Sequence, residues 1–113
     1  MRLLSLKSFR FALRGLWRSA QQEPNFRFEL AVAAVVLAGA VWLGFRGASL
    51  AFVLLATGVV LAGELFNTVL ERLLDLLEPR LNRLAGELKD TSAAAVLVLA
   101  LAAVLAAVAI FLG

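Results

Sequence analysis

The sequence predicts an all-α membrane protein, with an N-terminal amphipathic surface helix followed by three transmembrane helices. The first indication is composition, because 63% of the 113 residues are apolar and 17% are charged, against roughly 45–50% and about 25% in soluble domains. The second is three uncharged stretches, residues 30–45, 47–63 and 91–113, which approach or reach the ~20 helical residues that span a hydrocarbon core. So short a chain has too little polar surface to cover three such segments in a soluble fold.

The surface helix is expected over residues 1–22. On a helical wheel, basic residues fall within an arc of about 80° and apolar residues fill the opposite side. The basic residues are Lys7, Arg10, Arg14 and Arg18, and the apolar ones are Leu6, Phe9, Leu13, Leu16 and Trp17. This pattern is typical of a helix lying in the headgroup layer of an anionic membrane. A targeting peptide is the alternative interpretation.

The three transmembrane helices are expected at about residues 29–46, 48–72 and 90–112, within a single domain covering residues 1–113. The first two uncharged stretches are short, but polar flanking side chains can snorkel and extend them. The second helix should continue past the membrane edge, because Leu and Phe fill the gaps between the polar residues that follow Gly63.

The distribution of basic residues predicts the orientation in the membrane. Six lie before the first span and four between the second and third, whereas the turn between the first two spans has only Arg46 and the C-terminal end has none. Cytoplasmic loops carry the excess of Lys and Arg. We therefore expect a multi-pass protein of the plasma (inner) membrane, with its N-terminus cytoplasmic and its C-terminus outside.

The sequence limits the available chemistry. It contains no cysteine and no histidine, which excludes disulfides, thiolate metal sites and the commonest general base. The net charge of +3 does not indicate a nucleic-acid partner, because the basic residues are not interleaved with aromatic residues that stack on bases. Carboxylates, amides, hydroxyls, Lys and Arg must carry any reaction.

One face of the second transmembrane helix is unusually acidic. At 100° per residue, four polar side chains fall within an arc of about 80°: Glu64, Asn67, Glu71 and Asp75. Like charges at this spacing destabilise a helix, and a buried charge costs a few kcal/mol more, so we interpret this face as functional. The alternative is a set of solvated or ion-paired groups, with Arg72 and Arg14 as partners, which accounts better for Asp75 and Glu78 than for Glu64.

Further polar residues could join this acidic face. Pro24 suits the first turn of a helix, which would place Glu23 at that helix's positive end, and Glu29 lies at the mouth of the first span. Asp90 or Thr91 is expected to cap the start of the third span, with Lys89 beside it. Carboxylates, a lysine and a helix N-terminus suit Mg²⁺ and a nucleotide, although the usual nucleotide-binding loops are absent.

These motifs resemble the prokaryotic diacylglycerol kinase family, which includes the undecaprenol kinases. The resemblance is carried by Glu64-Leu-Phe-Asn67-Thr68-Val-Leu-Glu71-x-x-x-Asp75 and by Lys89-Asp90-x-Ser-Ala-Ala-Ala-Val. It extends upstream to Lys7-Ser-Phe-Arg10-Phe-Ala-x-x-Gly15 and Glu23-Pro-Asn-Phe-Arg27-x-Glu29. It covers nearly the whole chain, in order.

The resemblance implies a small membrane kinase that forms homotrimers with shared active sites. Such an enzyme transfers the γ-phosphate of MgATP to a lipid alcohol at the cytoplasmic interface. By position, Glu64 matches the catalytic base, and Glu23 and Glu71 match the metal ligands. The nucleotide site would comprise Arg10, Phe11, Asn67, Asp75, Lys89 and Asp90, and the lipid site Arg27 and Glu29. Phe11 stands where some members carry a tyrosine, and Lys7 is an alternative to Arg10.

Two other functions are compatible with parts of the sequence. A scaffold or pore-forming membrane protein would need only the basic amphipathic helix and three spans, and would not need the polar triplet of Glu64, Asn67 and Glu71. A cation-transport subunit could use a buried Glu64 but would not explain Lys89 and Asp90. If the protein is a lipid kinase, the sequence leaves open whether the lipid is undecaprenol or diacylglycerol.

Overall fold

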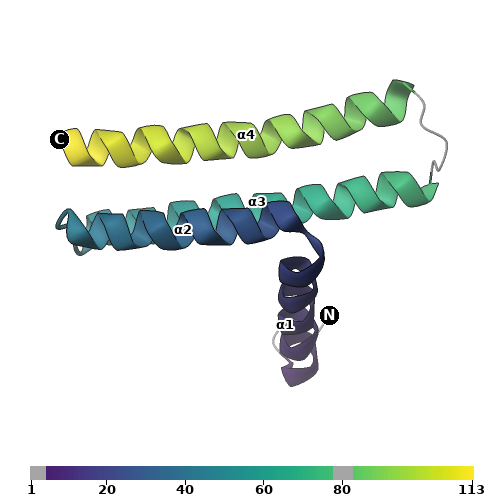
Figure 1. Ribbon diagram of the computed structural model, residues 1–113, viewed down its shortest axis with the longest axis horizontal. Helices are drawn as coiled ribbons and strands as arrows, with labels where there is room; N and C mark the ends of the chain where they lie inside the picture. The colour runs from purple at the N-terminus through teal and green to yellow at the C-terminus, as the bar shows by residue number, and fades with distance from the viewer. Residues whose placement is uncertain (1–4, 78–82) are drawn as a thin grey trace.

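The structure, a computed structural model, describes residues 5–77 and 83–113. This part of the chain forms four helices and no strand: α1 (Leu6–Gln22), α2 (Pro24–Trp42), α3 (Ala48–Leu77) and α4 (Arg83–Leu112) (Figure 1). The predicted all-α fold is confirmed. Glu78, for which a solvated or paired role was considered, lies outside the described residues.

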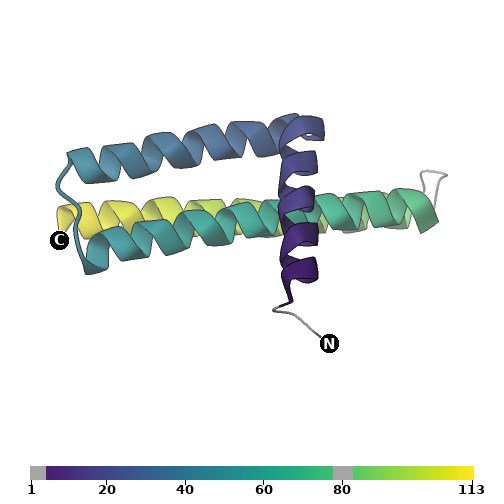
Figure 2. The ribbon, with the colours of Figure 1, turned by 90° about the horizontal axis from the view of Figure 1, so that it is seen from below.

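Three long helices run side by side, and a short one projects away from the start of α2 (Figure 1). The central helix, α3, packs against both α2 and α4. Helix α1 packs against α2 and stands roughly at right angles to the other three (Figures 1 and 2). The C-terminal part of α3 and the N-terminal part of α4 extend beyond the level at which α1 crosses, while the α2–α3 turn lies at the opposite end (Figure 2).

Helix α1 begins with a side-chain cap and leaves its apolar face uncovered. Ser5 is the N-cap, and its Oγ accepts a hydrogen bond from the Ser8 backbone N–H at 3.1 Å, which satisfies one of the free donors of the first turn. The large apolar side chains predicted on one face are all exposed: Leu6, Phe9, Leu13, Leu16 and Trp17. A helix of this kind is suited to the headgroup layer of a membrane.

Glu23 separates α1 from α2 at the right-angled bend. Its extended backbone (φ −113°, ψ 102°) serves as C-cap of α1 and N-cap of α2. Pro24 follows in the first turn of α2, as predicted, where its missing N–H needs no partner. The Glu23 side chain makes no capping hydrogen bond, so it is free to point toward α3.

The turn between α2 and α3 depends on two glycines. Gly44 and Gly47 adopt φ values of +91° and +56°, a region that residues with a Cβ rarely enter. The reversal allows α3 to pack back along α2.

Helices α2, α3 and α4 are each long and apolar enough to cross a membrane. At 1.5 Å per residue, the 30 residues of α3 and of α4 would measure about 45 Å, whereas the hydrocarbon core is about 30 Å thick. Each helix would therefore extend roughly ten residues past such a core. The extensions contain Glu71 and Asp75 on α3 and Lys89 on α4, so the polar residues lie at one end of the bundle.

The expected N-cap of the last helix is wrong. Helix α4 begins at Arg83, so Asp90 and Thr91 lie inside it and neither caps its first turn. Thr91 Oγ1 instead donates to the backbone oxygen of Glu87 at 2.9 Å. The expectation missed this because it placed the helix start at the uncharged stretch, whereas the charged residues Arg83 and Glu87 lie within the same helix. Lys89 therefore gains nothing from a helix N-terminus.

Candidate active site

The polar face of α3 is buried at its centre. Glu64 and Asn67 are the buried polar residues of the described chain, with 9% and 8% of their surfaces exposed. Asn67 Nδ2 donates to Glu71 Oε1 at 3.0 Å, one turn further along. The predicted common face of Glu64, Asn67 and Glu71 is therefore present, and its amide and one of its carboxylates are hydrogen-bonded.

Further carboxylates from two other places in the chain converge on Glu64. Those of Glu29 on α2, Glu71 on α3 and Glu23 at the α1–α2 bend are close enough to interact with it electrostatically. Four acidic groups, two of them on α3, thus interact near the end of α2 that joins α1. We use the name acidic cluster for these four residues: Glu23, Glu29, Glu64 and Glu71.

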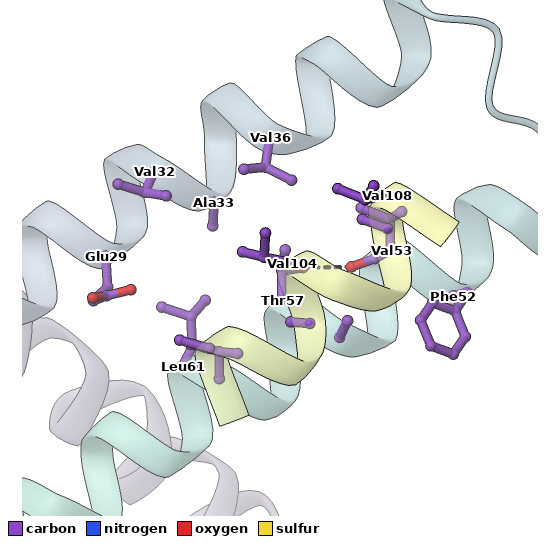
Figure 3. A pocket seen from close by; sticks show the side chains of 15 residues that line it. Glu29, Val32, Ala33, Val36, Phe52, Val53, Thr57, Leu61, Val104 and Val108 are labelled. Atoms are coloured by element: carbon purple, nitrogen blue, oxygen red, sulfur yellow. Dashed lines mark hydrogen bonds between the residues drawn. The ribbon is translucent and has the colours of Figure 1, made fainter. Parts of the chain in front are cut away.

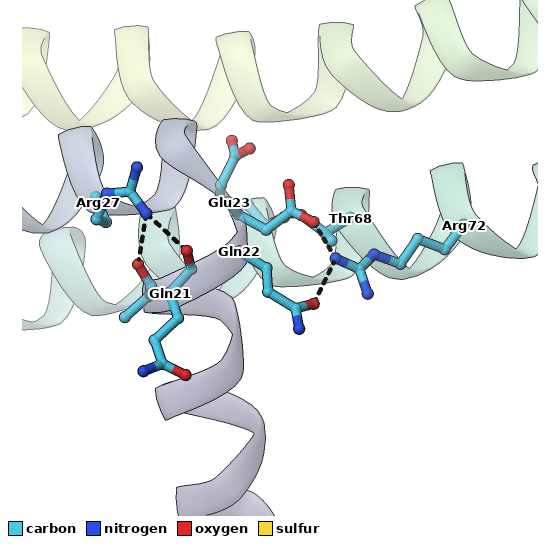
Figure 4. A network of polar contacts seen from close by, with 8 residues as sticks. Gln21, Gln22, Glu23, Arg27, Thr68 and Arg72 are labelled. Carbon is cyan, nitrogen blue, oxygen red and sulfur yellow. Dashed lines mark hydrogen bonds and ion pairs between the residues drawn. The ribbon is translucent and has the colours of Figure 1, made fainter.

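Arg72 joins the α1–α2 bend to α3. Its Nη2 donates to Glu23 Oε1 and lies 3.4 Å from Gln22 Oε1 (Figure 4). The sequence suggested Arg72 as a partner for acids on its own helix, but the acid it pairs with lies 49 residues away. The sequence offered no local signal for this pair, because only the right-angled bend brings Glu23 to α3.

Arg27 contacts α1 rather than the acidic cluster. Its Nη1 donates to the backbone oxygens of Ala20 and Gln21, at 3.1 and 2.8 Å (Figure 4). A positive side chain at these carbonyls satisfies free acceptors and is favourable at the negative end of a helix. Arg27 therefore helps to hold α1 against the start of α2.

Two contacts connect α4 to the polar face of α3. Lys89 Nζ donates to Asp75 Oδ1 at 2.5 Å, so the lysine faces the acidic side of α3 as predicted. Ser92 Oγ donates to Asn67 Oδ1 at 2.6 Å. Sequence reasoning did not select Ser92, although its position three residues after Lys89 in the same motif was available as a signal. Among the described residues, no hydrogen bond or ion pair involves the Asp90 side chain.

Arg10 and Phe11 are not brought to α3 by contacts within this chain. The Phe11 ring lies between two cations of its own helix, with Lys7 Nζ at 6.0 Å and Arg14 Cζ at 5.5 Å from its centroid. Within residues 5–77 and 83–113, no hydrogen bond or ion pair links Arg10 or Lys7 to the acidic cluster. The choice between these two basic residues stays open.

The donor chemistry of the acidic cluster fits Mg²⁺. Mg²⁺ prefers oxygen ligands and is commonly held by one or two carboxylates together with water and substrate phosphates. Carboxylate oxygens from Glu23 and Glu71 are of this kind. In the part of the chain that the structure describes, no group of three or more such side chains is arranged to hold a metal alone, so other ligands would have to come from phosphates and water.

An apolar cavity of about 280 Å³ extends from Glu29 between α2, α3 and α4 (Figure 3). Its one charged lining residue is Glu29, and the hydroxyl of Thr57 is already bonded to the backbone oxygens of Val53 and Leu54 at 3.0 and 2.9 Å. The remaining lining is Val32, Ala33, Val36, Phe52, Val53, Ala56, Val60, Leu61, Ala100, Ala103, Val104, Ala107 and Val108. Such a cavity suits a long apolar chain with one polar end.

Comparison with known proteins gives concordant similarities. The family described as "Prokaryotic diacylglycerol kinase" matches residues 10–111. The undecaprenol kinase of Bacillus subtilis is 35% identical over 106 residues, which cover 94% of this chain and 86% of that protein. The diacylglycerol kinase of Synechocystis is 35% identical over 101 residues, covering 88% of this chain and 58% of that protein.

Proposed function

The chain belongs to the prokaryotic diacylglycerol kinase family of lipid kinases, and on this premise we propose that it transfers the γ-phosphate of MgATP to a membrane lipid alcohol at the cytoplasmic face. The observation that carries the proposal is the position of Glu64. This carboxylate is buried and interacts electrostatically with three others, one of which, Glu29, lines the apolar cavity. A lipid hydroxyl and a nucleotide could meet there.

In the proposed reaction Glu64 is the general base. It accepts the proton of the lipid hydroxyl as the oxygen attacks the γ-phosphorus, and the bond to the β-phosphate oxygen breaks to release ADP. Glu71 and Glu23 would hold Mg²⁺, which would supply positive charge to neutralise the phosphates. Asn67 orients Glu71 through the 3.0 Å hydrogen bond between them.

The nucleotide is proposed to lie over the cytoplasmic end of α3 and α4. Asp75 and Lys89, joined at 2.5 Å, and the neighbouring Asp90 would form one wall of its site. Arg10 and Phe11 on α1 would complete it when α1 lies along the membrane surface. The basic residues of α1 would then be near the phosphates.

The lipid substrate is proposed to place its chain in the apolar cavity, with its hydroxyl near Glu29. We favour undecaprenol, because the similarity to the undecaprenol kinase extends over most of both chains, whereas this chain spans 58% of the diacylglycerol kinase. Diacylglycerol is the alternative. Arg27 would support the lipid site indirectly, by fixing α1 beside α2.

We further propose a homotrimer in the plasma membrane, with the N-terminus cytoplasmic and the C-terminus outside. The basic residues support this orientation. Shared sites are supported by an apolar groove between α3 and α4 that includes Phe66, Leu70 and Leu99 and borders Asn67 and Ser92. A neighbouring subunit in this groove would cover apolar surface and approach the site.

The decisive test is phosphate transfer from labelled ATP by the purified protein in detergent micelles. Undecaprenol and diacylglycerol are compared side by side, each with Mg²⁺ and with a chelator. We expect Mg²⁺-dependent transfer, faster to undecaprenol. Transfer to neither lipid would contradict the proposed function and favour a scaffold or pore-forming role, and faster transfer to diacylglycerol would reverse the substrate assignment.

A further inference from the structure

Arg72 is the cation that contacts the acidic cluster. Among the described residues, the Arg72–Glu23 ion pair is the only one that includes a carboxylate of the acidic cluster. Its Nη2 is shared between Glu23 and Gln22 (Figure 4). Of the other cations near the site, Lys89 is paired with Asp75, which is not in the cluster. Arg72 is therefore placed to respond to whatever binds Glu23.

Arg72 and a metal ion would compete for the same carboxylate. Glu23 is a proposed Mg²⁺ ligand, and its Oε1 accepts from the Arg72 guanidinium. A divalent ion at Glu23 repels the guanidinium and attracts the carboxylate more strongly than a single positive charge does. The pair is also exposed, with 54% of the Arg72 side chain accessible, and exposed ion pairs are weak. Metal binding can therefore displace Arg72 at little cost.

We propose that Arg72 is a nucleotide-phosphate ligand that pairs with Glu23 only while the metal is absent. The proposal rests on the proposed function. Once displaced, the guanidinium keeps its charge and its planar set of donors, which match phosphate oxygens in a bidentate geometry. It starts from α3 one residue after Glu71, the other proposed metal ligand, so metal-bound phosphates would lie within its reach. The ion pair would thus hold Arg72 at Glu23 until Mg²⁺ binds there, and Mg²⁺ binding would release the guanidinium to bind phosphate.

The proposal predicts two changes of opposite sign in Arg72→Gln. Without nucleotide, this variant should bind Mn²⁺, used as the probe metal, about two- to five-fold more tightly. The reason is that the weak, exposed ion pair no longer competes with the metal for Glu23. With saturating Mn²⁺, its affinity for a fluorescent ATP analogue should fall about ten- to a hundred-fold, the range expected for losing hydrogen bonds to a charged group. Arg72→Lys should bind nucleotide more weakly than wild type and more tightly than Arg72→Gln, because it keeps the charge and loses the planar fork.

Electron paramagnetic resonance of free Mn²⁺ measures the first change, and fluorescence anisotropy of the analogue measures the second. Arg46→Gln is the matched control, since Arg46 lies in the α2–α3 turn at the other end of the bundle, and it should alter neither affinity. Unchanged or weaker Mn²⁺ binding in Arg72→Gln, or unchanged nucleotide affinity, would overturn the proposal. If wild type transfers phosphate to lipid in the same preparation, such a result leaves the proposed function intact. A wild-type protein that binds neither probe would overturn both.

Discussion

Ser92 on α4 donates a hydrogen bond from its Oγ to Oδ1 of Asn67 on α3 at 2.6 Å. Because the amide oxygen of the buried Asn67 accepts this hydrogen bond, its amide nitrogen is turned toward Glu71. The nitrogen donates to Glu71 Oε1 at 3.0 Å. Two consecutive hydrogen bonds therefore run from α4 to a proposed metal ligand. The orientation of Glu71 depends on a helix that contributes no proposed metal ligand of its own.

Ser92→Ala should weaken metal use while the protein remains folded. Loss of the hydroxyl leaves Asn67 Oδ1 without its partner, and a hydrogen bond of this kind is worth about 1 kcal/mol. We expect the Mg²⁺ concentration for half-maximal rate to rise about five-fold, with Ser92→Thr restoring it. The matched control is Thr91→Ala, which removes the adjacent hydroxyl. A Mg²⁺ titration that is equal in Ser92→Ala and Thr91→Ala would show that Ser92 does not act through Asn67.

Glu64→Gln should abolish most phosphate transfer without unfolding the protein. Glutamine has the same shape but cannot accept the hydroxyl proton, and general-base catalysis is worth about 10²- to 10⁴-fold. The rate of transfer, measured beside the circular dichroism spectrum and the oligomeric state, tests this expectation. A variant that works at the wild-type rate would remove Glu64 from the role of base.

Glu71→Gln and Glu23→Gln should each raise the Mg²⁺ requirement. An amide oxygen is a weaker ligand than a carboxylate for this hard cation, so we expect about a ten-fold shift in the Mg²⁺ titration. Glu87→Gln is the control, because Glu87 is an exposed carboxylate that lies 3.7 Å from Arg83 within α4. If one of these two variants has the same Mg²⁺ titration as wild type, the replaced residue does not bind the metal.

Arg27→Gln should loosen α1. The lost hydrogen bonds to the oxygens of Ala20 and Gln21 involve a charged donor, and such bonds are worth about 1.5–3 kcal/mol. Trypsin should therefore cleave after Arg18 roughly ten-fold faster than in wild type, with Arg46→Gln as control. If the lipid KM rises while cleavage is unchanged, Arg27 contacts the lipid directly instead of positioning α1.

Several features of the site could be predicted from the sequence because they are local. One face of α3 carries Glu64, Asn67 and Glu71 because α3 is one uninterrupted helix. Helical periodicity places residues that are three, four and seven positions apart on the same face. The position of Pro24 in the first turn of α2 was likewise predictable from its fixed φ. Lys89 faces the acidic side of α3 because α3 and α4 are long helices that pack antiparallel.

Other features depended on contacts between distant segments. No periodicity relates Glu23 to Arg72, and none relates Ser92 to Asn67. The start of α4 at Arg83 was also missed, because Arg83, Glu87 and Lys89 precede the uncharged run used to locate the span. The role of Arg27 is set by carbonyls at the end of α1, which become available only because that helix ends at Gln22.

The sequence by itself determined that this protein is helical, apolar enough for three membrane spans, and acidic along one face of one helix. These properties follow from composition and from the 3.6-residue period, which act within single segments. Only the tertiary structure decided which groups meet: the bend at Glu23 brings that carboxylate to Arg72, and the packing of α4 on α3 brings Ser92 to Asn67. The physical reason is that hydrogen bonds and ion pairs act over a few ångströms, so they are fixed by the packing of helices rather than by the order of residues.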